Sequence, residues 1–239
     1  MSSESRARIM ARVRSSCAGN DAATIERELA GLGVAPAAQA PHEDSCVTFM
    51  VNVLRNQGTL DVAADRSTAV KLIGNYLYQH YRSHRLVAGN DPRLAAMPWR
   101  DGGVLPRFGE IEEGEQIALS YARWGLAETG ATVFFTGKRN PSRNNLLPEH
   151  HLVLVDADTL LPDLESLWRE VNTAIANGSR PRGIHCIAGP SSTGDIEGQI
   201  VYGAHGPRAW HVILMGNVSP EQQEAARALH AGKTGPAPA

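Results

Sequence analysis

The sequence predicts an α/β fold, a mainly parallel sheet with helices on both faces, preceded by a helical N-terminal arm. Short runs rich in Val, Ile, Leu and Phe, such as 131–136 and 152–155, are typical of strands buried on both faces of a parallel sheet. Segments with helical periodicity separate several of these runs, and strand–helix–strand order implies right-handed parallel crossovers. The 239 residues suffice for one large domain with a small appendage.

The predicted domains are an arm at 1–44, an α/β domain at 45–231 and a disordered tail at 232–239. In the arm, the expected elements are helices at 2–16 and 22–32, followed by an Ala- and Pro-rich extended stretch. The α/β domain is expected to contain helices at 46–56, 67–82, about 163–175 and 219–231. Its expected strands are 59–63, 85–88, 104–108, 117–121, 131–136, 152–155, 184–188 and 210–215. Asp65 and Ser219 are good helix caps.

Composition excludes several classes of protein. A net charge of −2 gives no general attraction to nucleic acid or to an anionic membrane. No stretch approaches the roughly 20 apolar residues that span a bilayer, and no apolar run follows the N-terminal arginines, which argues against a secretory signal. Cys17, Cys46 and Cys186 show no C-x-x-C spacing. We therefore expect a cytoplasmic protein with reduced thiols, in which no iron–sulfur cluster is bound by this chain alone.

The clearest candidate for an anion site follows the strand at 184–188. Ser192 and Asp195 stand at the S-x-x-D spacing of a capping box, which predicts that a helical turn starts here. A helix N-terminus offers free N–H groups to an anion. Asp195 and Glu197 would then cap the helix, bind a cation or act in acid–base chemistry. An ordinary capped turn explains these residues about as well.

Glu128 is the second candidate. It lies in a run of small residues that includes Thr129 and Gly130, and small neighbours let a backbone or a ligand approach closely. A carboxylate beside a buried strand needs a partner, or its pKa rises, which is one way to make a general base. The structural alternative is an ion pair with Arg123.

Histidines and one arginine complete the set. His150 and His151 precede the strand at 152–155, so they point to opposite faces and only one of them can face a site. His205 is another candidate. These histidines and Glu149 have no fixed ligand spacing, so we assign no metal. Arg143, in a loop after a strand, is suited to bidentate contact with an anion, and a solvated basic loop is an equally good explanation.

We expect the polar clusters at 128–130, 148–151 and 189–197 to form one site at the carboxyl edge of the sheet. The residues predicted as catalytic are Glu128, Asp195 and His205. The residues predicted to bind the substrate or anion are Thr129, Gly130, Gly189, Ser191, Ser192, Thr193 and Arg143.

Four blocks of sequence resemble the LUD-domain family, in the lactate-utilization protein C (LutC/YkgG) group. They stand in the family's order and read LAETG at 126–130, LLP at 146–148, GPSSTGDIE at 189–197 and GAHGP at 203–207. Gly194 and Ala204 depart from the family pattern, which has Ala and Val there. The resemblance covers roughly residues 45–216.

The resemblance implies a fold similar to the NagB/RpiA/CoA-transferase-like superfamily and a role in oxidising L-lactate to pyruvate. It also implies partner proteins that carry the iron–sulfur clusters, and it assigns no proven catalytic residue. The chain has no Gly-rich dinucleotide motif, which agrees with the absence of a cofactor bound by this chain alone. We expect a small anionic ligand, no nucleic acid and no membrane span. A homo-oligomer is left open.

Two other functions remain open at this point. The chain would be a stand-alone enzyme acting on a sugar phosphate, an acyl-CoA or a folate-like acid, with Glu128 as base or nucleophile and the loop at 189–194 holding the anion. Alternatively, it would be a regulatory module that binds a carboxylate or phosphate without turnover.

Overall fold

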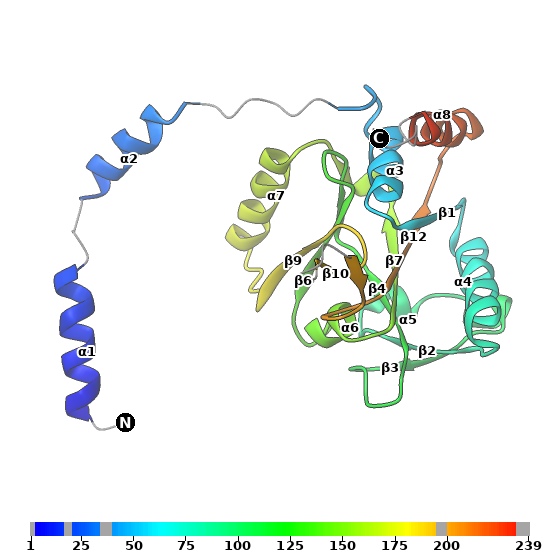
Figure 1. Ribbon diagram of the computed structural model, residues 1–239, viewed down its shortest axis with the longest axis horizontal. Coiled ribbons are helices and arrows are strands. Elements are labelled where there is room, and N and C mark those ends of the chain that lie inside the picture. The colour runs from blue at the N-terminus through cyan, green and yellow to red at the C-terminus, as the bar shows by residue number, and fades with distance from the viewer. Residues whose placement is uncertain (1–2, 17–20, 34–39, 195–199, 233–239) are drawn as a thin grey trace. The chain divides into compact units, whose positions relative to one another are not determined.

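The computed structural model describes residues 3–16, 21–33, 40–194 and 200–232, which Figure 1 traces in colour. The chain divides into two units, Met1–Gln39 and Ala40–Ala239. The first unit holds α1 (Ser3–Ser16) and α2 (Ala22–Gly31), and Asp21 caps α2 by accepting a hydrogen bond from the Thr24 backbone. Both predicted helices of the arm are therefore present. The predicted tail lies outside the described residues from 233 onward.

The second unit is built around a six-stranded, fully parallel sheet. In spatial order its strands are β1 (Thr59–Ala63), β12 (Ala209–Met215), β7 (His150–Asp156), β4 (Ile117–Tyr121), β2 (Arg85–Ala88) and β3 (Leu105–Phe108). A second sheet contains β8 (Leu160–Leu161), β5 (Trp124–Leu126), β6 (Ala131–Thr136) and β9 (Gly183–Ile187). A ribbon pairs β10 (Ser192–Gly194) with β11 (Ile200–Tyr202).

Helices pack against the sheets, and several of them begin at residues that favour a helix N-terminus. They are α3 (Ser45–Arg55), α4 (Arg66–Tyr81), α5 (Pro92–Ala95), α6 (Ser142–Leu146), α7 (Leu164–Ala176) and α8 (Pro220–Ala231), with 3-10 turns η1 (Trp99–Gly102) and η2 (Ala157–Thr159). Asp44, Asp65 and Asp163 cap α3, α4 and α7. Ser219 and Gln222 form a reciprocal capping box at α8. These caps satisfy backbone N–H groups that would otherwise lack partners. Of the helices in the described segments, none has the length and apolar character needed to cross a bilayer.

The parallel sheet is buried on both faces. On one face α4 packs Ile73 and Leu77 into the core that contains Leu152 and Leu154 of β7. On the other face α3, α8 and the second sheet share a core with β7. Figure 1 shows α4 and α7 on opposite sides of the strands. The predicted α/β class, with a mainly parallel sheet and helices on both faces, is confirmed.

The assignment of 131–136 to the parallel sheet is wrong. This segment forms β6, which pairs antiparallel with β5 and with β9. Only Ala127–Gly130 separate β5 from β6, and a connection this short cannot make the crossover that parallel strands need. The Trp-Gly-Leu run that forms β5 is too short to show a strand period, so this pairing could not be predicted from the sequence.

His150 and His151 begin β7 and point to opposite faces, as strand alternation predicts. The Nδ1 atom of His150 lies 2.8 Å from the Tyr76 hydroxyl, beneath α4. On the other face, the Nε2 atom of His151 lies 3.1 Å from the Ser120 hydroxyl, and its ring centroid lies 5.7 Å from that of Phe134. Both histidines are buried.

Burial lowers the pKa of His150 to about 4, and the nearby His80 contributes to the shift. Burial also lowers the pKa of His151 to about 3. Both side chains are therefore neutral in the folded protein near pH 7. In the unfolded chain each would take up a proton at its ordinary pKa of about 6.5.

We expect the free energy of unfolding to fall as the pH decreases from about 6.5 toward 4. The unfolded chain binds protons first, so the stability present above that pH is lost on acidification. At pH 5 the loss should be about 2 kcal/mol for each histidine, since one pH unit corresponds to about 1.4 kcal/mol. Urea unfolding at pH 7 and pH 5 measures it. His151→Gln should remove about half of the difference, and an unchanged difference would contradict this account.

Candidate anion-binding site

The turn Ala127–Gly130, one of the blocks singled out in the sequence, rests on the C-terminal end of α3. Asn52 Nδ2 donates to the first two carbonyl groups of the turn at 2.8 and 3.0 Å, and Asn56 Nδ2 donates to the Thr129 carbonyl at 2.7 Å. Gly130 has a φ of 69°, and a Cβ there would lie 2.6 Å from the backbone of α3. Gly130 therefore allows the turn to pack closely against α3.

Glu128 is half-buried, and its carboxylate has a structural partner. Its Oε2 accepts a hydrogen bond of 2.9 Å from the backbone N–H of Leu164, the first residue of α7. Arg123, the alternative partner expected from the sequence, instead places its guanidinium 4.7 Å from the Trp124 ring centroid and 4.9 Å from that of Phe135. The carboxylate thus stabilises the positive end of a helix.

The loop that starts at Gly189 meets the loop of the GAHGP block. Gly189 has a φ of 104°, and a Cβ there would lie 2.4 Å from the Asn56 carbonyl oxygen. The Ser191 N–H donates to the Pro207 carbonyl at 2.8 Å, and the Ser191 carbonyl accepts from the Gly203 N–H at 2.9 Å. The structure therefore brings the LAETG, GPSST and GAHGP blocks together through α3 and Ser191.

The helical turn predicted to start at Ser192 is wrong. Ser192, Thr193 and Gly194 form β10, in which Ser192 pairs with Tyr202 of β11. Polar residues that usually favour helix caps occur in this strand because it belongs to an exposed, two-stranded ribbon. Ser192–Gly194 consequently offer no helix N-terminus to an anion. Asp195 and Glu197 lie outside the described residues.

The remaining predicted residues are spread over the surface. His205 is exposed in the loop between β11 and β12, and no hydrogen bond or ion pair joins it to Glu128. Arg143 lies in α6, 3.9 Å from the Glu110 carboxylate. Within the described segments, no three His, Cys, Asp or Glu side chains are arranged to hold a metal ion.

Glu149 is fully engaged at the amino end of β7. Its Oε1 lies 2.7 Å from the Arg208 guanidinium. Its Oε2 accepts from the Tyr81 hydroxyl and from Gln116 Nε2, both at 3.1 Å. Four side chains are thus tied together beside a cavity of about 400 Å³ that the GAHGP loop also lines. The chain's own donors thus occupy three of the roughly four acceptor positions of this carboxylate.

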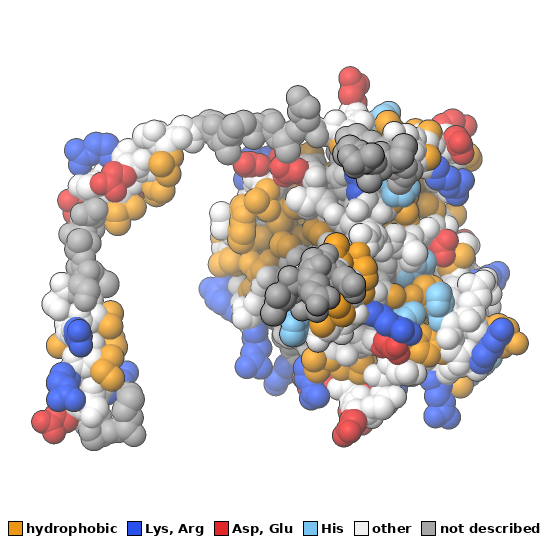
Figure 2. All heavy atoms as spheres, viewed as in Figure 1, with side chains coloured by type: hydrophobic (Ala, Val, Ile, Leu, Met, Phe, Trp, Pro, Cys, Tyr) orange, Lys and Arg blue, Asp and Glu red, His pale blue; other side chains and the backbone are white. Residues whose placement is uncertain are grey.

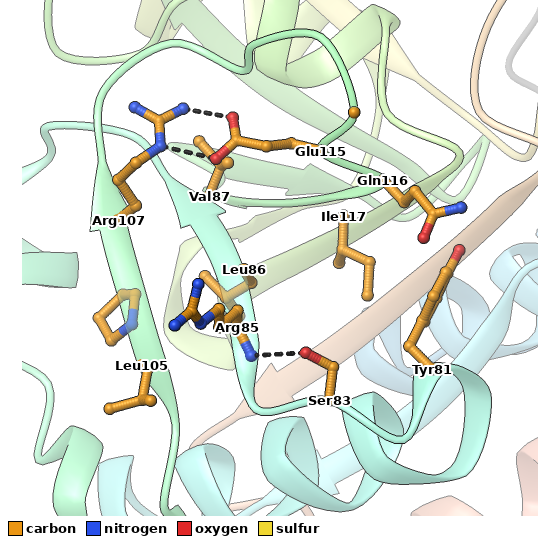
Figure 3. Close-up of a pocket in the computed structure, with 12 residues that line it drawn as sticks. Tyr81, Ser83, Arg85, Leu86, Val87, Leu105, Arg107, Glu115, Gln116 and Ile117 are labelled. Carbon is orange, nitrogen blue, oxygen red and sulfur yellow. Dashed lines mark hydrogen bonds and ion pairs between the residues drawn. The ribbon is translucent and has the colours of Figure 1, made fainter.

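A cavity of about 580 Å³ lies beside β2, β3 and β4, and Figure 3 shows its lining. Arg107 and Glu115, both part of the lining, point toward one another, and the Arg107 Nε–H donates to Glu115 at 2.6 Å. This hydrogen bond lowers the pKa of Glu115. Leu86 and Ile117 contribute apolar surface, so the exposed Arg85 is the cation left for a ligand. The cavity has little charge to select an anion.

The carboxyl edge of the parallel sheet, where the anion site was expected, is acidic. A cavity of about 840 Å³ there is lined by Asp65, Asp156 and Asp158, with Arg66 as the cation. Asp65 already caps α4 by accepting from the Thr68 N–H at 2.7 Å. Helix N-termini at this edge are occupied by the chain's own side chains, which makes the edge unfavourable for an anion.

A cationic cavity lies at the ends of β6 and β9 beside α6, and its volume is about 460 Å³. It is lined by Lys138, Arg143 and Arg182, with His185 and a single carboxylate, Glu110. Figure 2 shows basic side chains gathered in this region of the body, at its lower left. Glu110 and Arg143 are both more than half exposed, so their 3.9 Å pair is weak and easily replaced by a ligand carboxylate.

Arg143 was the residue of this cavity that the sequence suggested, and Lys138, Arg182 and His185 were missed. The antiparallel register that places Thr136 opposite Gly183 brings the basic residues after β6 next to those before β9. The signal was present as two short basic clusters separated by more than forty positions. Only the pairing of β6 with β9 joins them.

We expect Glu128→Ala to lower the free energy of unfolding by about 1 kcal/mol, because α7 loses an acceptor at its first N–H group. Glu128→Gln keeps an acceptor oxygen and should lose less than half as much. Urea unfolding measures both variants. Glu165→Ala, an exposed change in the first turn of α7, is the control for the loss of charge alone. If Glu128→Ala leaves stability unchanged, the carboxylate has no structural role.

Comparison with known proteins identifies the family. The LUD domain matches residues 112–215, which contain all four sequence blocks. Lactate utilization protein C of Halalkalibacterium halodurans is 30% identical over 181 residues, covering 69% of this chain and 79% of that protein. The uncharacterized protein YkgG of Escherichia coli strain K12 is 38% identical over 121 residues, covering 50% of this chain and 52% of that protein.

A solved structure agrees with the fold. A DUF162 family protein from Deinococcus radiodurans aligns with a TM-score of 0.54 and 18% identity, covering 72% of this chain and 96% of that one. The sequence matches show that the chain belongs to the LUD-domain family, in the group of lactate utilization protein C and YkgG.

Proposed function

We propose that this chain takes part in lactate utilisation and that it binds a small carboxylate in the cationic cavity beside α6. Similarity to lactate utilization protein C over more than two thirds of the chain supports the process. The positive charge of the cavity supports a carboxylate as the ligand. Lys138, Arg143 and Arg182 line the cavity with a single carboxylate, Glu110, so the lining carries excess positive charge.

The geometry suits an acid of a few carbon atoms. A guanidinium can bind a carboxylate through two parallel N–H···O bonds, and an ammonium adds a point charge. The volume of about 460 Å³ falls within the range of small-molecule sites and leaves room for water. Lys138 and Arg182 have no ion-pair partner among the described residues. A ligand carboxylate would therefore gain partners without first breaking a strong internal salt bridge.

The redox chemistry is assigned in this proposal to iron–sulfur partner proteins, as the family resemblance implies. This chain would supply binding and presentation of the acid. Glu128, which was predicted as catalytic, accepts a hydrogen bond from the first residue of α7. Asp195, the other carboxylate predicted as catalytic, lies outside the described residues. Glu149 is held by three donors.

The cavity is tested by direct binding. Titration of the purified chain with lactate and with pyruvate at low ionic strength should show saturable binding of both. Arg143→Gln and Arg182→Gln should each raise the Kd about threefold to tenfold, because each removes a charge-assisted hydrogen bond at an exposed position. Arg227→Gln, an exposed change on α8 away from the cavity, is the matched control and should leave the Kd unchanged. Equal affinity of all variants would remove the cavity from the proposal.

The process is tested in extracts of cells that lack the chain. Lactate-dependent electron transfer should be lost and should return when the wild-type chain or Arg227→Gln is added. Arg182→Gln should restore it only at higher lactate concentration. Full electron transfer without the chain would exclude a role in lactate utilisation, whatever the cavity binds.

A further inference from the structure

A chain of polar side chains runs from the buried face of β7 to the cationic cavity. His151 of β7, Ser120 of β4 and Asn145 of α6 are at most 1% exposed. The distances are 3.1 Å from His151 Nε2 to Ser120 Oγ, 2.8 Å from Ser120 Oγ to Asn145 Oδ1, and 3.3 Å from Asn145 Nδ2 to His185 Nδ1. A buried polar group without a hydrogen-bond partner destabilises the folded protein. These side chains avoid that cost by bonding to one another in a continuous hydrogen-bond chain.

The donors in this chain all point the same way. The Ser120 hydroxyl uses its one hydrogen to donate to Asn145 Oδ1, so His151 Nε2–H must be the donor to Ser120. The amide nitrogen of Asn145 can only donate, so His185 Nδ1 accepts. Burial lowers the pKa of His185, which keeps the ring neutral near pH 7. A neutral ring with Nδ1 as acceptor carries its hydrogen on Nε2.

The opposite direction is less favourable. If the Asn145 amide were turned over, every bond would reverse, and His151 Nδ1 would carry a hydrogen. That atom is buried and has no hydrogen-bond partner. A buried N–H without an acceptor is rarer than a buried acceptor without a donor. The unpartnered atom at the far end of the chain therefore favours the observed direction.

The hydrogen on Nε2 of His185 lies at the cavity. A Cβ added to Gly183 would lie 3.1 Å from Thr136 Oγ1 and 4.0 Å from His185 Nε2, and all three residues line the cavity. The Thr136 hydroxyl donates to the Gly183 carbonyl at 3.1 Å, and no hydrogen bond joins Thr136 to His185 Nε2; His185 is bonded to Asn145 through Nδ1. Nε2–H is therefore a donor available to a ligand oxygen.

We propose that Ser120 and Asn145 hold His185 as the Nε2–H tautomer, and that the cavity consequently selects acids with an acceptor oxygen beside the carboxylate, the 2-oxo and 2-hydroxy acids. The inference rests on the proposed function and adds the class of ligand. The cations bind the carboxylate, and His185 donates to the oxygen on the neighbouring carbon. In this state His185 cannot remove the hydroxyl proton of a 2-hydroxy acid, because Nε2 already carries a hydrogen. Asn145 acts as a positioning residue.

The tautomer is measured in the ligand-free protein. Nitrogen-15 NMR of the histidine rings should show His185 with Nε2 protonated at pH 7. Asn145→Asp offers only an acceptor to Nδ1, so it should move the hydrogen to Nδ1. Ser120→Ala removes the hydroxyl donor that orients the Asn145 amide, so it should produce a mixture of both His185 tautomers. If the Asn145→Asp variant does not fold, Ser120→Ala tests the proposal in its place. An Nδ1–H ring in the wild type, or the same tautomer in every variant, would overturn the proposal.

Selectivity is measured with pyruvate, lactate and propionate, since propionate has the same carbon chain without the oxygen on the carbon next to the carboxylate. Pyruvate and lactate should bind about threefold to tenfold more tightly than propionate, the effect of one neutral hydrogen bond. His185→Phe should abolish this ratio and leave the propionate Kd unchanged, whereas Arg182→Gln should weaken all three acids alike. A ratio that survives in His185→Phe would overturn the inference. If no acid binds the wild type, the proposed function fails, and the ligand-free NMR still reports the tautomer.

Discussion

The burial of β7 on both of its faces is the constraint on which the rest of the structure depends. It lies between β12 and β4 in parallel register, and its side chains alternate between the core under α4 and the core shared with α3 and the second sheet. Every residue of the strand from His150 to Val155 is buried. Polar groups on such a strand must find partners inside the protein, since water cannot reach them. The two histidines therefore require Tyr76 on one face and Ser120 on the other.

This requirement links the core to the candidate site. The partner of His151 is Ser120, and Ser120 in turn orients Asn145, whose amide reaches His185 at the cationic cavity. A short helix, α6, carries both Asn145 and Arg143, so one element supplies a buried connection and an exposed cation. The chemistry at the surface thus depends on a hydrogen-bond direction that is established in the dry interior.

The two ends of the fold differ in the charge of their side chains. Aspartates cap α3, α4 and α7, and each fills the positive end of its own helix. The carboxyl edge of the sheet, the usual ligand site of parallel α/β folds, carries one of these caps, Asp65, together with Asp156 and Asp158. Basic residues instead gather where the antiparallel strands β6 and β9 end. Two motif residues also have packing roles, since Gly130 and Gly189 permit close contact with the C-terminal end of α3.

The sequence by itself determined the α/β class, most helices and strands, and the caps Asp65 and Ser219, because burial period and capping chemistry are local properties. The tertiary structure decided the direction of β6, the strand at Ser192 and the grouping of Lys138 with Arg182. These depend on which strands pair, and pairing follows from connection lengths and from faces that meet across long separations. A capping motif such as that at Ser192 is overridden when a partner strand satisfies the same backbone groups.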